Sequence, residues 1–262
     1  MKILVGPAGS SGLGNLEGVK QVANLGMQAM ECEFTYGVNL SNEKAKLVGE
    51  LAKKLNISLS VHAPYYINLN SHEKKKIEDS KRRILESCER GHYLNATHIV
   101  FHPGFYGKKS KEETFDIIAE EIKEIIKIIR ERKWDVKLAP ETTGKLNVFG
   151  DLNEIMELVK ETKCGFTIDF AHILARSKGK IDYDDVFDKL KNHDYLHCHF
   201  SGIEWGEKGE KHHKLTPDKE IKELVSEILK RKKSVTIINE SPDPVKDSLK
   251  MRDEFIKQGW KW

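Results

Sequence analysis

The chain has 262 residues, 39% of them hydrophobic and 32% charged, with a formal net charge of +3. These values exclude a disordered chain, and they permit a nucleic-acid partner without requiring one. The four cysteines contain no Cys-x-x-Cys pair, which argues against a disulfide framework and a thiolate zinc site. Apolar stretches are too short for a signal peptide or a bilayer span, so we expect a cytoplasmic protein without a membrane partner.

Short apolar and β-branched runs alternate with longer segments of helical periodicity. Strands are predicted, in chain order, over Ile3–Gly6, Ala29–Glu33, Ser58–His62, Ile99–His102, Lys137–Glu141, Gly165–Asp169, Tyr195–His199 and Ser234–Glu240. Ser41 and Asp151 are expected to cap the second and fifth helices. The clearest helix is predicted over Lys111–Glu131, where isoleucines at steps of three and four residues line one face.

This alternation is typical of βα units around a parallel sheet. The chain contains eight such units without a Pro-rich linker or low-complexity tract, which favours a closed barrel over a doubly wound open sheet. We therefore predict an α/β fold, a single (β/α)8 TIM barrel forming one domain over residues 1–262. The open sheet is the alternative. In a barrel of this kind, function lies at the carboxyl ends of the strands.

Six predicted strands end on a side chain that can bind a metal ion. From the third strand to the eighth, they are His62, His102, Glu141, Asp169, His199 and Glu240. A single His there is more often a structural residue, and a single Glu a solvated charge. Six together would repel one another or stay unsatisfied without cations, because buried charges must be paired or coordinate metals. Such a set without Cys suits zinc, manganese or iron(II) better than calcium.

Further candidate ligands lie outside this ring, on segments after the sixth and seventh strands. They are His172, Glu210 and His212. The segment around Glu210 is rich in Lys, Glu and Gly, and such a loop is usually only a solvated connection. His213 is an open alternative to His212, since the sequence does not distinguish adjacent histidines. His197 alternates with His199 along its strand and is expected one layer deeper, in the barrel core or directly behind the metal ligands.

Five segments resemble, in the same order, conserved blocks of the endonuclease IV family. They are His62-Ala63-Pro64-Tyr65-Tyr66-Ile67-Asn68-Leu69, Phe101-His102-Pro103-Gly104, Pro140-Glu141-Thr142-Thr143-Gly144, Ile168-Asp169-Phe170-Ala171-His172 and Glu210-Lys211-His212-His213. The resemblance spans nearly the whole chain, and His199 and Glu240 stand where the family has ligands. It implies a zinc-dependent endonuclease that acts in base excision repair, cuts damaged duplex DNA 5′ to an abasic site and leaves a 3′-hydroxyl. We expect a monomer.

The resemblance also implies roles for single residues. Three zinc ions are implied: the first held by His62, His102 and Glu141, the second by Glu141, Asp169, His199 and Glu240, and the third by His172, Glu210 and His212. Bound zinc lowers the pKa of water from about 15.7 towards 7, which supplies hydroxide as the nucleophile. The catalytic candidates are Glu141, Asp169 and Glu240. Tyr65 and Tyr66 are candidates for DNA contact, although Tyr65 packed within a βα loop is an equal interpretation.

The sequence departs from the family at several positions. Glu210 replaces an Asp, which leaves occupancy of the third site open. The loop Phe34–Asn39 lacks the arginine that the family inserts into DNA. The alternative function is a sugar isomerase or epimerase, which typically binds one Mn²⁺ or Mg²⁺ on the same fold. Glu33, at the end of the second strand, would fit a sugar pocket, whereas the number of histidines favours the nuclease.

Overall fold

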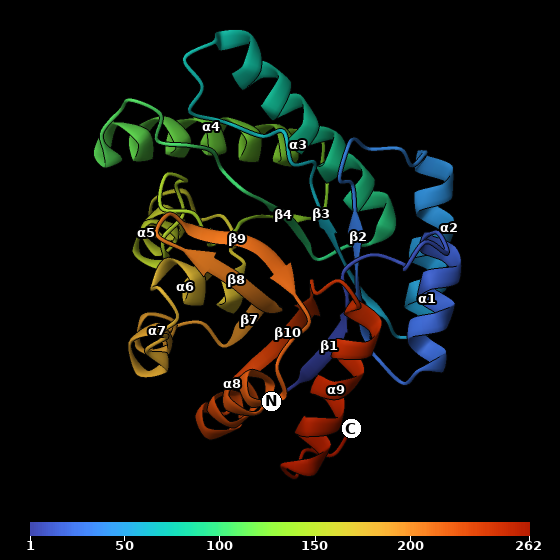
Figure 1. The fold of residues 1–262 in the computed structure, drawn as a ribbon. Helices are drawn as coiled ribbons and strands as arrows, with labels where there is room; N and C mark the ends of the chain where they lie inside the picture. Colours follow the sequence, from blue (N-terminus) through green and yellow to red (C-terminus); the bar gives the residue numbers. More distant parts are fainter.

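A computed structural model describes residues 1 to 262 and contains a barrel of parallel strands surrounded by helices (Figure 1). The barrel strands are β1 (Ile3–Pro7), β2 (Ala29–Glu33), β3 (Ser58–His62), β4 (His98–Phe101), β5 (Lys137–Pro140), β6 (Ile168–Asp169), β7 (Tyr195–Phe200) and β10 (Ser234–Asn239). They form two four-stranded sheets, in the orders β1-β10-β7-β6 and β2-β3-β4-β5.

Two parallel bridges join these sheets into a closed barrel. One pairs Ala8 with Glu31 at the β1–β2 edge, and the other pairs Glu141 with Thr167 at the β5–β6 edge. Gly6 permits the first approach, because a Cβ there would lie 1.6 Å from the carbonyl oxygen of Ala29. The (β/α)8 TIM barrel predicted from the sequence is therefore confirmed, and the open sheet is excluded.

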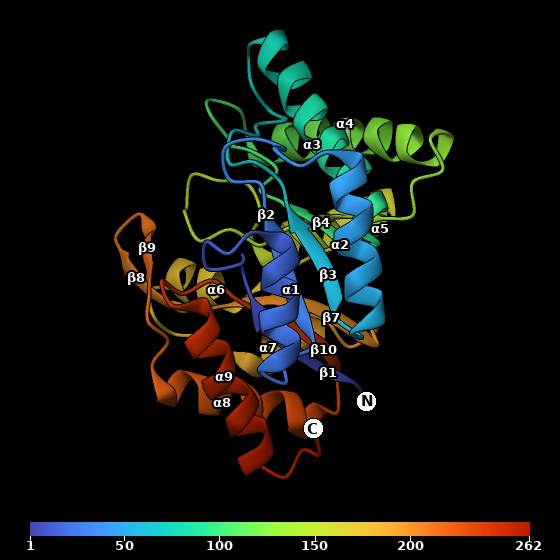
Figure 2. The same cartoon turned by 90° about the vertical axis from the view of Figure 1, so that its right-hand side faces the viewer.

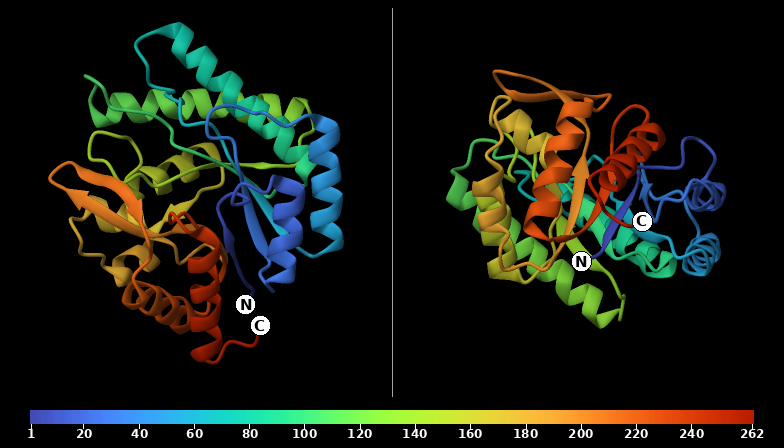
Figure 3. Two further views of the ribbon diagram at one scale, coloured as in Figure 1. Left: turned by 45° about the vertical axis from the view of Figure 1, so that its right-hand side comes forward. Right: turned by 90° about the horizontal axis from the view of Figure 1, so that it is seen from below.

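The helices form a ring around the strands, which is clearest from below (Figure 3, right). They are α1 (Asn15–Asn24), α2 (Asn42–Lys54), α3 (Lys74–Leu94), α4 (Lys111–Glu131), α5 (Leu152–Thr162), α6 (Phe170–Arg176), α7 (Tyr183–Lys189), α8 (Asp218–Arg231) and α9 (Pro244–Lys257). None of them is long and apolar enough to span a membrane.

Helix α4 shows how local sequence fixes these elements. Its bounds are those predicted, and Ile118, Ile122, Ile125 and Ile129 are buried against the barrel. At its start, the Ser110 side chain accepts a hydrogen bond from the Glu113 N–H, and the Glu113 carboxylate accepts one from the Ser110 N–H. The expected caps Ser41 and Asp151 are confirmed at α2 and α5.

The segment after β7 differs from its prediction as a loop. It forms an antiparallel hairpin of β8 (Gly202–Gly206) and β9 (Gly209–Lys214), which projects beside α6 at the barrel mouth (Figures 1 and 2). The pairing contains a β-bulge, because Trp205 pairs with Glu210 whereas Glu204 pairs with His212. Polar residues on both faces of β9 hide the alternation by which buried strands are normally recognised.

Candidate metal centre

The carboxyl ends of six barrel strands bring metal-competent side chains to one mouth of the barrel. Each side chain belongs to the last residue of its strand, the last but one, or the residue that directly follows: His62 (β3), His102 (β4), Glu141 (β5), Asp169 (β6), His199 (β7) and Glu240 (β10). Parallel pairing of neighbouring strands places these residues at similar heights along the barrel axis. Asp169 of β6, for example, pairs in register with His199 of β7. The structure therefore brings together the whole ring expected from the sequence.

Glu141 lies at the centre of this ring and is fully buried. Its Oε2 atom lies 2.8 Å from His102 Nε2 and 3.4 Å from His62 Nε2. Its Oε1 atom lies 2.9 Å from His199 Nδ1. The two carboxylate oxygens thus face different sets of imidazoles, so Glu141 can belong to two coordination groups at once.

Two sets of potential ligands meet at Glu141. In the first, donor atoms of His62, His102 and Glu141 all lie within 4.8 Å of one another. In the second, donor atoms of Glu141, Asp169, His199 and Glu240 satisfy the same limit, and His199 Nδ1 lies 3.2 Å from Glu240 Oε1. These sets have the composition that the sequence resemblance implies for the first two ions.

The third set differs from the predicted one. It consists of Asp169, His172 and His213, whose donor atoms lie within 4.8 Å of one another, and Glu210 Oε2 lies 3.5 Å from His172 Nε2. The side chain of His212 is exposed instead. The bulge in β9 explains the exchange: an extra residue between Glu210 and His213 shifts the alternation, so both face the site. The structure therefore places His213, the open alternative, at the site, and not the predicted His212.

The adjacent histidines provide a matched pair of variants. We expect His213→Ala to lower the number of bound metal ions by about one and to leave the overall fold unchanged, because only a partly exposed rim residue is shortened. His212→Ala should keep the wild-type metal content, since its imidazole is exposed. Elemental analysis of the two purified variants measures this. Equal metal contents in them would contradict the assignment.

Hydrogen bonds of the histidines show that a cation fits this site. In three histidines Nδ1 lies beside a backbone carbonyl oxygen: at 2.8 Å from that of Ala63 in His62, at 2.9 Å from that of Thr142 in His172, and at 3.1 Å from that of Glu240 in His213. A carbonyl oxygen only accepts, so Nδ1–H donates and Nε2 keeps its lone pair for a metal ion. The free Nε2 atoms of His172 and His213 face each other at 3.3 Å. Two acceptor nitrogens in this position require a proton or a metal ion between them.

The carboxylates add to the need for positive charge. Burial disfavours the ionised form of Glu141, but the charges of His199 and His102 outweigh burial and keep the pKa of this carboxyl well below its ordinary value. Burial and the nearby carboxylates raise the pKa of Asp169 to about 6 despite the charge of His172. The Oδ2 atom of Asp169 is buried without a hydrogen-bond partner. An orphaned oxygen between two ligand sets is a position that a bound cation would satisfy.

Above these groups lies an open pocket of about 580 Å³. Tyr65 lines it and is 60% exposed, whereas Tyr66 is 64% exposed and is not among the lining residues. Glu33 also lines the pocket, and burial raises the pKa of its carboxyl to about 8 despite the opposing charge of His62. Glu31, which is buried beneath the ring, was not among the predicted site residues. The Glu31-Cys32-Glu33 alternation on β2 was the available signal.

The amino-acid sequence matches the family described as a xylose isomerase-like TIM barrel over residues 19–259. The chain belongs to this family. An uncharacterized protein of Methanocaldococcus jannaschii is 39% identical over 240 residues, covering 86% of this chain and 85% of that protein. A probable endonuclease 4 of Thermoplasma volcanium is 31% identical over 157 residues, or 58% of this chain. That alignment spans 53% of the endonuclease's own length.

Solved structures with a similar fold include different enzymes. Endonuclease IV from Thermus thermophilus is 19% identical, with a TM-score of 0.71 over 99% of this chain and 100% of that one. D-psicose 3-epimerase is 15% identical, with a TM-score of 0.69 over 98% of this chain and 96% of that one. At such identities the likeness establishes the fold alone, so the choice of reaction has to be argued from the site.

Proposed function

We propose that this chain is a zinc-dependent endonuclease that hydrolyses the phosphodiester 5′ to an abasic site in duplex DNA. The observation that carries the proposal is the sharing of Glu141 and Asp169 between neighbouring ligand sets. Adjacent metal ions suit a phosphodiester, because both the attacking and the leaving oxygen need charge stabilisation. The relative named as a probable endonuclease 4 supports the same substrate class.

Each ligand set has a part in this proposal. The first ion would be held by His62, His102 and Glu141, the second by Glu141, Asp169, His199 and Glu240, and the third by Asp169, His172 and His213 with Glu210 beside them. When bound, the ions lower the pKa of water towards 7 and stabilise negative charge on phosphate oxygens. The carboxyls of Glu141 and Glu240 are ionised at neutral pH, as metal ligands must be. Burial disfavours the ionised form, but the charge of nearby His199 outweighs burial and keeps the pKa of both groups below the ordinary value.

The pocket suits an extruded abasic nucleotide. Its volume of about 580 Å³ lies in the range of small-ligand sites, and it opens at the barrel mouth. An abasic nucleotide has no base to unpair, so moving it out of the duplex costs less than moving an intact nucleotide. This difference gives selectivity without any contact to a base.

The test combines a metal count with an incision assay. The protein is purified without added metal, analysed for bound elements, and incubated with duplex DNA that carries one abasic site. We expect two or three zinc ions per chain and a nick 5′ to the lesion that leaves a 3′-hydroxyl, with no nick in the same duplex lacking the lesion. A metal-loaded protein that leaves the abasic strand intact would contradict the proposal.

A sugar epimerase is the second candidate, and Glu33 is the observation that favours it. A carboxyl group with a pKa near 8 beside the pocket is suited to proton transfer at carbon. The two functions differ in metal content and substrate. One manganese ion per chain, turnover of a ketose, and loss of that turnover in Glu33→Gln would support the epimerase instead.

Tyr65 provides a test of DNA contact at the rim. We expect Tyr65→Ala to raise the KM for abasic DNA about tenfold with little change in kcat, because stacking on an aromatic ring is worth about 1–3 kcal/mol. Tyr66→Ala is the matched comparison, since Tyr66 is equally exposed but does not line the pocket. Steady-state incision kinetics measure both. A larger KM effect for Tyr66 would contradict the assignment.

A further inference from the structure

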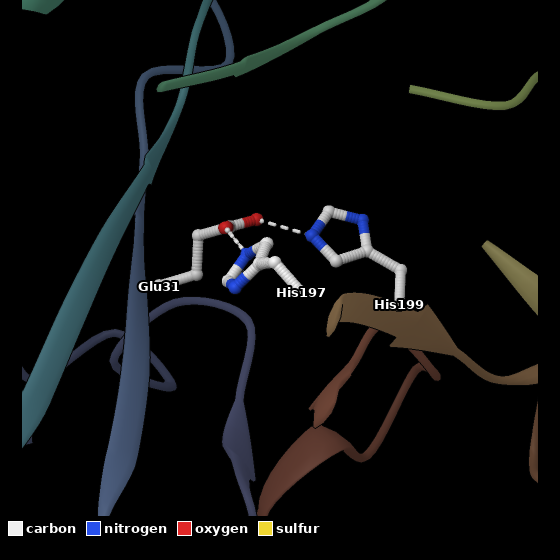
Figure 4. Close-up of side chains that lie close together, drawn as sticks. All are labelled: Glu31, His197 and His199. Atoms are coloured by element: carbon white, nitrogen blue, oxygen red, sulfur yellow. Dashed lines mark hydrogen bonds and ion pairs between the residues drawn. The ribbon is translucent and has the colours of Figure 1, made fainter. Parts of the chain in front are cut away.

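A second buried cluster lies beneath the candidate metal centre. It consists of Glu31 on β2 with His197 and His199 on β7, and all three side chains are buried (Figure 4). Glu31 is inside the barrel, one layer below Glu33, because the two are separated by one residue of the same strand. His199 thus belongs both to this cluster and to the ring above it.

Both carboxylate oxygens of Glu31 face polar partners. Oε1 lies 3.0 Å from His199 Nε2, as the dashed line in Figure 4 marks. Oε2 accepts a hydrogen bond of 2.6 Å from the Ser60 hydroxyl and lies 3.4 Å from His197 Nε2. The opposite nitrogen of His199, Nδ1, faces Glu141 and Glu240. The imidazole therefore connects Glu31 to the metal centre, with one nitrogen facing each.

The charge on Glu31 is consistent with this arrangement. Burial disfavours an ionised carboxylate, but the charge of His199 and the hydrogen bond from His197 leave the pKa of Glu31 well below its ordinary value. A carboxylate 3.0 Å from Nε2 of His199 favours the tautomer that carries its proton on Nε2, in which Nδ1 has the lone pair. It also makes that lone pair more basic, and so a better metal ligand.

We propose that Glu31 is a positioning residue that orients His199 and strengthens it as a metal ligand. The proposal deepens the proposed function and rests on it, because it assumes a metal ion at His199. In this role Glu31 acts through the imidazole of His199 rather than by contact with the ion or the substrate. Carboxylate partners of this kind typically change metal affinity by about 10–100-fold.

The first experiment measures zinc affinity without DNA, by competition with a chromophoric chelator. Glu31→Gln keeps the size of the side chain and can still accept a hydrogen bond, but it loses the charge. Glu31→Ala loses both. We expect Glu31→Gln to weaken the binding of one zinc ion about tenfold and Glu31→Ala about 100-fold. Ser60→Ala is the matched control: it removes a hydrogen bond to Oε2 and leaves the contact between Oε1 and His199, so its zinc affinity should stay near that of the wild type.

The second experiment needs no variant. In the zinc-loaded wild type, ¹⁵N NMR of the histidine rings should show His199 protonated at Nε2 and bound through Nδ1. Cobalt-substituted Glu31→Gln should also show a shifted visible absorption band, which a purely structural role of Glu31 would not produce. Zinc bound through Nε2 of His199, or unchanged zinc affinity in both Glu31 variants, would overturn the proposal.

These outcomes separate the proposal from the proposed function. Normal zinc affinity in a wild type that does not cut abasic DNA would contradict only the nuclease function. Incision of abasic DNA by the wild type together with unchanged zinc affinity in the Glu31 variants would contradict only the positioning role. A wild type that binds no metal would contradict both.

Discussion

Replacing Glu141 by glutamine should lower incision at an abasic site by more than about 100-fold and reduce the number of bound metal ions by at least one. Glu141 is the residue that the first two ligand sets share, and its two oxygens face different histidines. A partner that only supports a ligand changes metal affinity by about 10–100-fold, so a ligand shared by two sets should have the larger effect. Elemental analysis and single-turnover incision measure the two consequences.

The matched control is Glu121→Gln on α4, in the outer ring of helices. Glu121 pairs with Lys81 of α3 at 2.9 Å and belongs to none of the ligand sets, and glutamine keeps the size of its side chain. This variant should bind metal and cut DNA as the wild type does. Full metal content and incision in Glu141→Gln would show that the carboxylate is not shared between ions.

Much of the site could be predicted because the topology of the barrel places it. Parallel strands end at one mouth, so the residue at the end of each strand identifies a member of the ring, as His62 and Asp169 show. The strands were recognisable from short β-branched runs, and helix α4 from the spacing of its isoleucines. Neither inference needed a contact between distant residues.

The remaining features depend on contacts that a single sequence does not reveal. The exchange of His212 for His213 follows from a bulge whose partner strand, β8, was itself not predicted. Glu31 is separated from His199 by most of the chain, and the two meet only when the barrel closes. An acidic residue within a predicted strand gave no indication that its partner would be an imidazole.

In the metal-free protein His62 and His172 should be strongly basic. Burial disfavours their charged form, but the surrounding carboxylates outweigh the effect of burial. Glu141 beside His62 raises the pKa of the His62 imidazole to about 10. Asp169 beside His172 raises the pKa of the His172 imidazole to about 9. A folded-state pKa above the unfolded value of 6.5 contributes stability that is fully present below pH 6.5. This contribution is lost as the pH rises through 9 and 10.

Metal ions must displace these protons, because only a neutral imidazole is a ligand. Carboxylates also raise the pKa of the ligand His199 well above its ordinary value. Zinc binding at pH 7.5 should therefore release about three protons, one each from His62, His172 and His199. The affinity for each ion should rise about tenfold per pH unit for each proton displaced. Calorimetric titrations in two buffers with different ionisation enthalpies give the number of protons released. Above pH 10 the release from His62 and His172 should fall towards zero. Zinc binding that releases no protons at pH 7.5 would show that these imidazoles are already neutral in the metal-free protein, or that they are not the ligands.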